Sequence, residues 1–261
     1  MSLADRFDGF LIDLDGVVWI GRQPVPGSAE ALRDLLAAGK RLVFVTNNPG
    51  RHPAAYAERL QEMGIEVGAE RIVTAGMVVA RLAGEAAGAD GTAFVIGGPA
   101  LKEMVAATGA RVLEGEPAEE AGVVVVSGHR DFNYGELVTA KRALDRGASL
   151  FATSHDPTMP YPGGELPGTG SILAAVETAS ARRAEIAGKP ERHLFEMAVK
   201  AVGIEGPLAM VGDRLSSDIA GGAGAGLETI LVLSGTTTRE QAAAAEPAPD
   251  FVLDDLAGLL A

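Results

Sequence analysis

The sequence of 261 residues contains no cysteine, only 5% aromatic residues and no long uninterrupted apolar segment. The lack of cysteine excludes disulfides, thiol catalysis and thiolate metal sites, so any metal must be bound through oxygen or histidine ligands. The apolar runs are short and broken by glycine or charge, and no basic segment followed by an apolar core is found near the N-terminus. These patterns argue against a membrane span and a signal peptide, so we expect a cytoplasmic location.

Positive charge is also scarce, since 22 Lys and Arg stand against 35 Asp and Glu, a formal net charge of −13. Nucleic acids and anionic membranes are bound through clustered Lys and Arg, so we expect neither as a partner. A hydrophobic fraction of 47% with 22% charged residues is typical of a globular chain, and the length allows one large domain or two modest ones. A phosphate substrate would need a locally positive site.

The stretch FLIDLDGVVW, Phe10–Trp19, is the feature around which the rest of the chain is interpreted. Its nearly continuous apolar start predicts a strand of a parallel sheet that is covered on both faces. Asp13 and Asp15 lie two residues apart where this strand passes into a loop, and ligands of open α/β sheets bind at that end. Neighbouring carboxylates repel, so a cation or shared proton is expected between them. A solvated Asp-x-Asp-Gly turn is the alternative that this stretch alone leaves open.

Strands and helices alternate along the chain, which predicts right-handed crossovers and a parallel sheet. Ser28 is expected to cap a helix, a further helix is expected from about Met77, and Ser216 is expected to cap another. The most irregular stretch is Ser154–Gly170, with four prolines and four glycines, and we expect a functional loop there. The expected strands are 10–14, 41–45, 71–74, 92–96, 123–126, 150–153, 185–187, 208–211, 229–233 and 251–253.

Polar residues interrupt the apolar pattern at four places where a strand or short link enters a loop. Each has a plain explanation, such as loop capping, a surface lysine or a turn. Together they supply a nucleophilic carboxylate, hydroxyl and amide donors, a cation and a second acidic pair, which phosphoryl transfer through an acyl phosphate requires. The four places are Asp13 with Asp15, Thr46 with Asn47 and Asn48, Lys189, and Asp213 with Asp218.

In this order the four places resemble the motifs of the haloacid dehalogenase (HAD) superfamily of phosphatases. Three further segments are similar to its branch of NagD-type and 4-nitrophenyl phosphatases: Val126–Tyr134, Ala152-Thr153 and Pro167–Ser171. The resemblance spans nearly the whole chain. It implies an α/β fold in which a Rossmann-like parallel-sheet core, residues 1–78 plus 185–261, carries an inserted α/β cap domain of the C2 type, residues 79–184.

The resemblance also implies an activity: Mg²⁺-dependent hydrolysis of small-molecule phosphate monoesters. Asp13 would attack phosphorus and become an aspartyl phosphate, while Asp15 would protonate the leaving alcohol and then deprotonate the attacking water. Lys189 would offset negative charge on the nucleophile and the phosphate. The phosphoryl oxygens would be bound by Thr46, Asn47 and Asn48.

The magnesium site implied by the resemblance is built from oxygen atoms alone, as Mg²⁺ prefers. Asp213 would complete it with the carboxylate of Asp13 and the backbone carbonyl of Asp15. Asp218 is also expected at this metal site, as an outer support rather than a direct ligand. By the same resemblance Gly16–Gly21, with Trp19, would form a small flap over the site, and ordinary core packing explains Trp19 equally well.

Specificity is expected to come from the cap, because the stretch Ser154–Gly170 should reach the leaving group through Asp156 and Met159. A histidine that pyridoxal phosphate phosphatases tend to carry after Asp-Pro is missing after Asp156-Pro157, which weakens the assignment of that substrate but leaves it compatible with the core. This chain departs from the family pattern at two places. It has Ala152-Thr153-Ser154 where the family usually has Ala-Thr-Asn, and Ser217 where the family usually has a threonine before the last aspartate of the motif. The branch also implies a homodimer formed through the cap.

Two other functions are compatible with parts of the sequence. A phosphomutase would use the same aspartyl phosphate, although no sugar-binding cluster is found. A phosphate- or nucleotide-binding protein without hydrolysis is suggested by the segment Val95–Pro99, which follows a strand and precedes a helix. Pro99 disrupts the G-x-G-x-x-G spacing of a dinucleotide loop, which disfavours this interpretation.

Overall fold

The protein, described here by a computed structural model that covers residues 2–161 and 164–261, forms two compact units. The first unit consists of Met1–Thr46, Pro53–Val73 and Lys189–Ala261, and the second of Asn47–His52 and Thr74–Gly188. Each unit contains its own sheet. The boundaries at residues 79 and 184 between a catalytic core and a cap remain a prediction.

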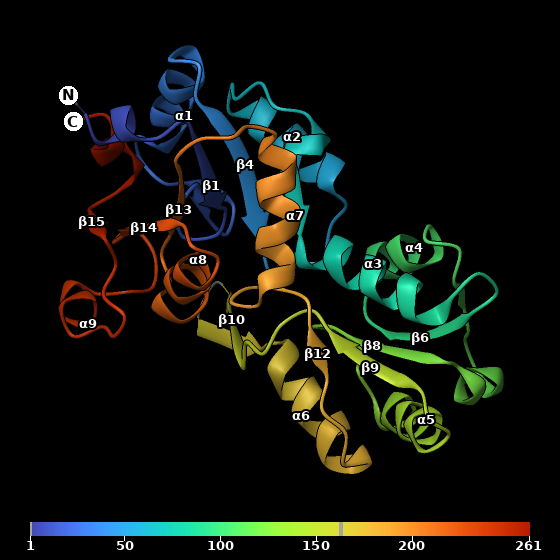
Figure 1. Ribbon diagram of the computed structural model, residues 1–261. Helices are drawn as coiled ribbons and strands as arrows, with labels where there is room; N and C mark the ends of the chain where they lie inside the picture. Colours follow the sequence, from blue (N-terminus) through green and yellow to red (C-terminus); the bar gives the residue numbers. More distant parts are fainter. Residues whose placement is uncertain (1, 162–163) are drawn as a thin grey trace. The chain divides into compact units, whose positions relative to one another are not determined.

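The first unit is built on a six-stranded sheet with the strand order β15-β14-β13-β1-β4-β5 (Figure 1). The pairs β1–β13, β1–β4, β13–β14 and β14–β15 are parallel. The strands are β1 (Gly9–Asp13), β4 (Arg41–Thr46), β5 (Ile72–Thr74), β13 (Leu208–Gly212), β14 (Glu228–Val232) and β15 (Phe251–Leu253). The sequence predicted all six of these strands.

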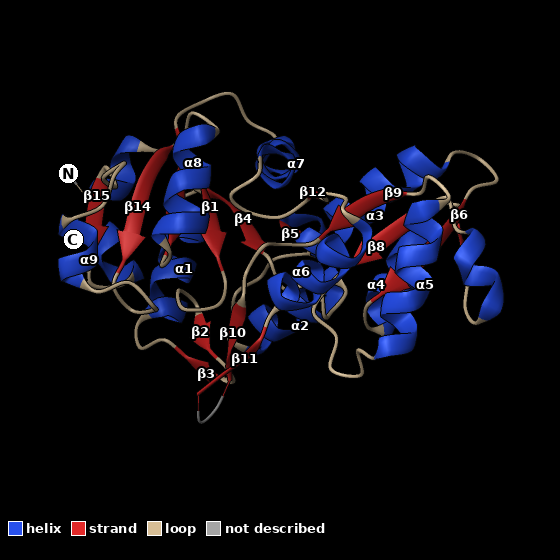
Figure 2. Cartoon of the chain, turned by 90° about the horizontal axis from the view of Figure 1, so that it is seen from below, coloured by secondary structure: helices blue, strands red, loops and turns tan. Residues whose placement is uncertain are grey.

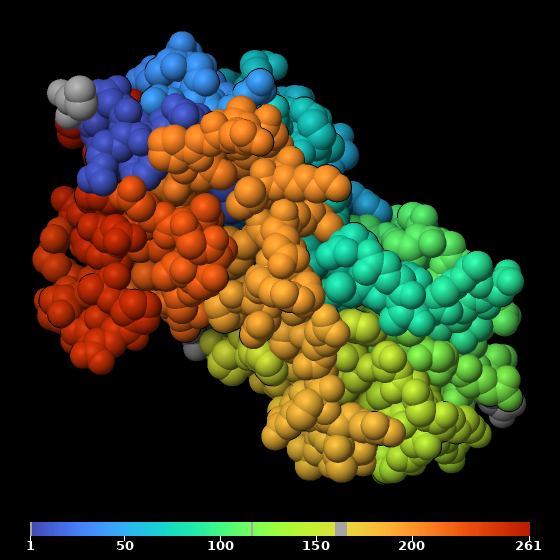
Figure 3. Space-filling view, in the orientation of Figure 1, coloured from blue at the N-terminus to red at the C-terminus, as the bar shows by residue number. Residues whose placement is uncertain are grey.

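Helices cover both faces of this sheet, with α1 and α2 on one face and α7 and α8 on the other (Figure 2). Every residue of β1 is therefore buried, as the continuous apolar run predicted. In the space-filling view of Figure 3, the part of the chain that contains α7 and α8 lies at the surface, in orange. The helices of this unit are α1 (Ser28–Ala37), α2 (Pro53–Glu62), α7 (Arg192–Val202), α8 (Ala220–Gly224) and α9 (Arg239–Ala243).

The register of the central strands decides which polar residues become neighbours. Asp13 pairs with Val45 of β4, and Ile12 pairs with Val211 of β13. Because the strands are parallel, their carboxyl ends meet at one edge of the sheet. Asp13, Thr46 and the residue that follows β13, Asp213, lie at this edge.

The second unit contains a five-stranded sheet with the order β12-β9-β8-β6-β7, and the pairs between these neighbours are parallel. Its central strand β8 is four buried valines. Helices α3 and α4 pack together on one face and α5 and α6 on the other (Figure 1). The elements are β6 (Thr92–Ile96), β7 (Arg111–Val112), β8 (Val123–Val126), β9 (Ser149–Ala152), β12 (Glu185–Ile186), α3 (Ala75–Ala87), α4 (Pro99–Ala106), α5 (Tyr134–Asp145) and α6 (Thr169–Ser180).

Each unit also carries a short antiparallel hairpin. In the first unit β2 (Trp19–Ile20) pairs with β3 (Gln23–Pro24), directly after the two aspartates of the opening motif. In the second unit β10 (Thr158–Tyr161) pairs with β11 (Gly164–Pro167). The expectation of an irregular loop over Ser154–Gly170 is therefore wrong for these eight residues, and Pro162 and Gly163 lie outside the described residues.

Three predicted helix starts differ from the structure. Ser28 is the first residue of α1 rather than its cap, and its hydroxyl donates to the carbonyl of Val18 at 3.0 Å. Ser216 lies inside a turn of π-helix, η4 (Leu215–Ile219), where the carboxylate of Asp218 accepts a hydrogen bond from the backbone N–H of Arg214. Helix α3 begins two residues before the predicted start, because Thr74 caps it.

We find no helix in residues 2–161 and 164–261 that combines the length and the apolar character needed to cross a membrane.

Candidate active site

Asp13 and Lys189 form a buried ion pair at the carboxyl edge of the first sheet. Asp13 is 6% exposed and Lys189 is 4% exposed. The ammonium group of Lys189 donates to Asp13 Oδ1 and lies 2.7 Å from Asp218 Oδ1. One cation thus serves two carboxylates from segments more than 200 residues apart in the sequence.

Asp213 is held by a loop that follows β14. Its Oδ2 accepts hydrogen bonds from the backbone N–H of Thr236 at 2.7 Å and from the Thr236 hydroxyl at 2.8 Å. The Thr237 hydroxyl donates to the backbone carbonyl of Asp213. The other carboxylate oxygen, Oδ1, is buried and has no hydrogen-bond partner among the described residues. This oxygen is available to a ligand.

Two glycines allow the backbone to come close to Asp213. A Cβ atom on Gly16, whose φ is +96°, would lie 2.5 Å from Asp213 Oδ2, and a Cβ on Gly235 would lie 2.0 Å from the same oxygen. The hydroxyl of Ser234 donates to the carbonyl of Gly16 at 2.7 Å and ties these two segments together. Glycine is therefore required at both positions.

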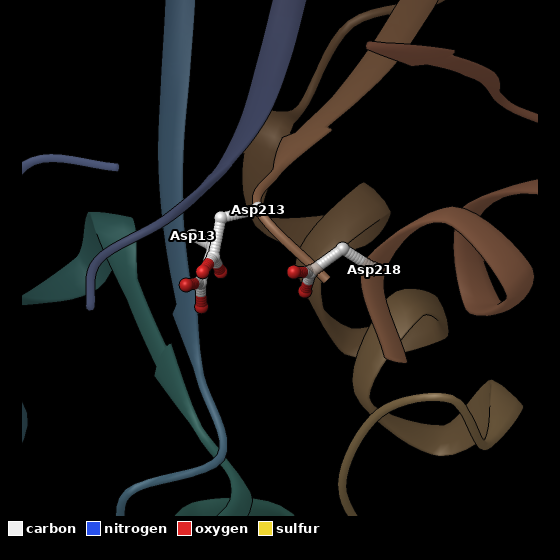
Figure 4. A group of neighbouring side chains, drawn as sticks. All are labelled: Asp13, Asp213 and Asp218. Atoms are coloured by element: carbon white, nitrogen blue, oxygen red, sulfur yellow. The ribbon is translucent and has the colours of Figure 1, made fainter. Parts of the chain in front are cut away.

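The carboxylates of Asp13, Asp213 and Asp218 form a buried group, with one oxygen of each within 4.8 Å of the others. Figure 4 shows the Asp218 carboxylate pointing toward the other two. Three carboxylates at this separation repel one another strongly, and Lys189 supplies only one positive charge. The orphaned Asp213 Oδ1 and the all-oxygen donor set fit a divalent cation of the kind of Mg²⁺.

The electrostatics of this group reflect burial and mutual repulsion. Burial raises the pKa of Asp13, the repulsion of Asp218 and Asp213 raises it further, and Lys189 opposes the shift. Burial and Asp218 likewise raise the pKa of Asp213, against the hydrogen bonds from Thr236. Burial alone lowers the pKa of Lys189, but the charges of Asp13 and Asp218 outweigh it and raise that pKa. Lys189 is therefore cationic at neutral pH.

Asp15 has a different environment from Asp13, although only one residue separates them. Burial raises the pKa of Asp15, and the hydrogen bond from Trp19 partly opposes this shift. The donor is the indole N–H of Trp19, which lies 3.0 Å from Asp15 Oδ1. Trp19 is 1% exposed, so it is a core residue and a partner of the second aspartate at once.

The remaining predicted residues are divided between the two units. Thr46 is buried at the end of β4, beside β1. In the second unit, Asn47 donates to the carboxylate of Asp156 at 3.1 Å, and the side-chain oxygen of Asn48 accepts from the backbone of Gly50, as a turn-forming asparagine does. Met159 is 38% exposed. The contacts of these residues with a substrate remain predictions.

Two parts of the site were not predicted from the sequence: the loop Ser234–Thr238 and Arg59, which stacks on Trp19. The loop could have been predicted, because it is a fifth polar segment that directly follows a predicted strand, β14. Arg59 could not have been predicted, because in the sequence an arginine on the polar side of a helix is indistinguishable from a solvated surface residue. Its guanidinium carbon lies 3.8 Å from the centroid of the Trp19 ring.

Comparison with known proteins agrees with this arrangement of motifs. The sequence model of one protein family, the haloacid dehalogenase-like hydrolases, matches residues 10–111. A second family model, described as HAD-hydrolase-like, matches residues 186–259. The chain belongs to the haloacid dehalogenase-like hydrolases. The matches contain the segments that carry Asp13, Thr46, Lys189 and Asp213, and the family expected from the sequence is confirmed.

Several HAD-like hydrolases are similar over nearly their whole length. The glycerol-3-phosphate phosphatase of Gallus gallus is 37% identical, covering 99% of this chain and 93% of that protein. The chronophin of Mus musculus is 37% identical over 99% of this chain and 94% of its own.

Solved structures of HAD-like hydrolases confirm the predicted fold class. The glycerol phosphate phosphatase of Mycobacterium tuberculosis, crystallised with magnesium, has a TM-score of 0.91 at 35% identity, covering 99% of this chain and 78% of that one. The 4-nitrophenylphosphatase of Thermotoga maritima has a TM-score of 0.89 at 34% identity, covering 99% and 98%.

Proposed function

We propose that the protein is a Mg²⁺-dependent phosphatase that hydrolyses small-molecule phosphate monoesters through an aspartyl phosphate on Asp13. The observation that carries the proposal is the buried group of Asp13, Asp213 and Asp218 with Lys189 at the carboxyl edge of a parallel sheet. It contains the nucleophile, the cation and the metal-binding oxygens of phosphoryl transfer. Relatives named for glycerol-3-phosphate and 4-nitrophenyl phosphate hydrolysis support the substrate class.

Asp13 is the nucleophile in this proposal. Its Oδ1 is paired with Lys189, whose positive charge opposes the upward shift that burial gives the pKa of this carboxylate. The other oxygen attacks phosphorus, so that an O–P bond forms to Asp13 as the bond to the leaving oxygen breaks. Lys189 also offsets the negative charge that the phosphoryl group brings into the buried site.

Asp15 is the general acid and base. It gives a proton to the leaving oxygen while the aspartyl phosphate forms, so the product leaves as a neutral alcohol. Asp15 then takes a proton from water as the water oxygen bonds to phosphorus and the bond to Asp13 breaks, which releases phosphate and restores both residues. Its raised pKa suits this role, because the carboxyl group must carry a proton near neutral pH.

The metal site consists of residues from three segments. Asp13, Asp213 and the backbone carbonyl of Asp15 would hold Mg²⁺, and Asp218 would support the site from the side of Lys189. When bound, Mg²⁺ neutralises carboxylate charge and polarises a phosphoryl oxygen. Asp213 Oδ1 is held ready for this purpose, because Thr236 binds only the other oxygen of the same carboxylate.

Several finer assignments belong to the same proposal. Thr46, Asn47 and Asn48 would bind phosphoryl oxygens, and Asp156 and Met159 of the cap would contact the leaving group. The cap of residues 79–184 would exclude water from the reaction. A homodimer formed through the cap and a cytoplasmic location complete the proposal.

The proposal is tested by hydrolysis of 4-nitrophenyl phosphate. Activity should require Mg²⁺, should be lost in excess chelator and should fall at least about 10³-fold in Asp13→Asn. Asp34→Asn, a change of an exposed aspartate on α1, is the matched control and should retain normal activity. Full activity of Asp13→Asn would overturn the mechanism.

A second variant separates chemistry from binding. Asp15→Asn should still bind Mg²⁺ and inorganic phosphate, because its backbone carbonyl is unchanged, but should lose turnover. Normal turnover in this variant would refute the acid and base role. A requirement for a sugar bisphosphate primer, with transfer to a sugar rather than to water, would identify a phosphomutase instead.

A further inference from the structure

The carboxyl group of Asp15 is fixed by the only tryptophan in the chain. Trp19 Nε1 lies 3.0 Å from Asp15 Oδ1. An indole N–H can only donate, so Oδ1 must act as the acceptor. The indole hydrogen bond occupies a lone pair of Oδ1, so a proton carried by the carboxyl group is favoured on the other oxygen, Oδ2. The bond therefore distinguishes the two oxygens of Asp15.

Trp19 cannot turn away from Asp15, because the backbone around it is closely tied. The N–H of Gly16 donates to the carbonyl of Trp19 at 2.7 Å, and the N–H of Trp19 donates to the carbonyl of Leu14 at 3.2 Å. These bonds close a tight loop between Asp15 and the indole. The side chain of Trp19 is buried, so its N–H would lose a partner if Asp15 moved.

Arg59 of α2 fixes the plane of the indole from outside the loop. Its guanidinium carbon lies 3.8 Å from the ring centroid, and its Nη2 donates to the carbonyl of Gly21 at 2.8 Å. Gly21 lies in the turn between β2 and β3, so Arg59 binds the ring and the hairpin that carries it. Such a cation–π contact attracts the guanidinium to the face of the indole ring. Helix α2, the hairpin and Asp15 are thereby joined in one network.

We infer that Trp19 and Arg59 are positioning residues that orient the Asp15 carboxyl group so that Oδ2 transfers the proton in both halves of the reaction. The inference rests on the proposed role of Asp15 as general acid and base. In the first half, the Oδ2–H bond breaks as the leaving oxygen gains that proton and its bond to phosphorus breaks. In the second half, Oδ2 gains a proton from the water that attacks the aspartyl phosphate.

The inference predicts a dependence on the leaving group that a merely structural residue would not cause. An alkyl alcohol is a poor leaving group and needs a proton as it departs, whereas 4-nitrophenolate departs without one. Loss of the orientation of Asp15 should therefore reduce kcat/KM on an alkyl phosphate far more than on 4-nitrophenyl phosphate. General loss of folded protein would reduce both equally.

The first test compares Trp19→Phe with the wild-type Mg²⁺-loaded enzyme on glycerol 3-phosphate and 4-nitrophenyl phosphate. Phenylalanine keeps an aromatic ring for Arg59 and removes the N–H. We expect kcat/KM to fall roughly 30-fold on the alkyl substrate and roughly threefold or less on the aryl substrate. Equal losses on both substrates, or no loss on either, would overturn the inference.

The second test acts on Arg59 and leaves the indole in place. Arg59→Met should lower kcat/KM on glycerol 3-phosphate more than on 4-nitrophenyl phosphate, but by a smaller factor than Trp19→Phe does. Arg59→Lys should recover part of the lost kcat/KM on glycerol 3-phosphate. Arg33→Met is the matched control, because Arg33 is an exposed arginine that also donates to a backbone carbonyl, that of Met63 at 2.9 Å. Arg33→Met should leave the ratio of the two kcat/KM values unchanged, and an equal change in that ratio would contradict the role of Arg59.

A third measurement observes the hydrogen bond without relying on activity. The single tryptophan gives one indole N–H resonance in a ¹⁵N-edited NMR spectrum, and this signal should move upfield in Asp15→Ala. An unmoved signal would refute the bond even if Trp19→Phe did not fold. Asp13→Asn distinguishes the failure of the proposed function from the failure of this inference. If Asp13→Asn stays active, the proposed function fails. The indole signal still reports whether Trp19 contacts Asp15.

Discussion

Gly16 lies so close to Asp213 that a Cβ atom at this position would be 2.5 Å from Asp213 Oδ2. The glycine that follows the two aspartates of the opening motif thus serves a residue almost 200 positions away. Its φ of +96° also belongs to the region that favours glycine. The motif and the segment that carries Asp213 are therefore fitted to each other through this one backbone position.

The first prediction follows from this contact. In Gly16→Ala the methyl group must displace the Asp213 carboxylate, so Mg²⁺ affinity measured by calorimetry should fall at least about tenfold. Gly21→Ala is the matched control, because Gly21 also has a positive φ, +58°, but no atom lies within 4 Å of its added Cβ. Both variants should lose about 1 kcal/mol or more of stability, and only Gly16→Ala should lose Mg²⁺ affinity. Equal Mg²⁺ affinities would contradict the fit.

The second prediction concerns the buried cation. Lys189→Met leaves Asp13 and Asp218 without their counter-charge, so the free energy of unfolding without metal should fall by about 3–5 kcal/mol. Denaturant unfolding should show the deficit shrinking when Mg²⁺ is added, because the metal supplies positive charge. Lys200→Met, at an exposed position on α7, should change stability by no more than about 0.5 kcal/mol. A loss in Lys189→Met as small as in this control would refute the ion-pair argument.

The third prediction concerns pH. Burial raises the pKa of Asp13 and of Asp213, so the metal-free folded state binds protons more tightly than the unfolded chain does. Its stability should fall as the pH rises through these raised pKa values. We expect Mg²⁺ to bind these carboxylates in their ionised form, so its stabilising effect should grow over the same range.

Thermal unfolding with Mg²⁺ or with chelator, from about pH 5 to about pH 8, measures this dependence. The difference between the two melting temperatures should increase with pH. Lys189 does not contribute, because its raised pKa keeps it protonated throughout this range. A difference independent of pH would show that the carboxylates do not hold the metal.

The fourth prediction concerns specificity. Asp156 accepts a hydrogen bond from Asn47 at 3.1 Å and lies shortly before β10. If it contacts the leaving group, Asp156→Asn should change the ratio of kcat/KM between two alkyl phosphates by roughly tenfold, with a smaller effect on 4-nitrophenyl phosphate. Asp131→Asn, an exposed aspartate of the same unit, is the control. Uniform loss on all substrates would count against the assignment.

Much of the fold could be predicted from local pattern. The apolar runs at 10–14, 41–45 and 208–211 predicted parallel strands, because a strand covered on both faces has no polar alternation. Helix starts were less predictable. Ser28 was expected to cap α1, but its hydroxyl binds the carbonyl of Val18 instead, and a capping pattern does not reveal which acceptor a folded chain brings near.

By itself, the sequence determined the chemical groups of the site and their order along the chain: Asp13, Thr46, Lys189 and Asp213. Each of these groups could be recognised from the few residues around it, because a strand passes into a loop at that point. Parallel register then brings strand ends together, because β1 lies between β4 and β13.

Only the tertiary structure decided which groups contact one another. Lys189 is shared by Asp13 and Asp218, Thr236 binds one oxygen of Asp213, and Trp19 binds one oxygen of Asp15. These contacts join residues that are far apart in the sequence, or depend on the side-chain direction within a tight loop. No periodicity encodes them, because distances of this kind are set by the packing of whole elements.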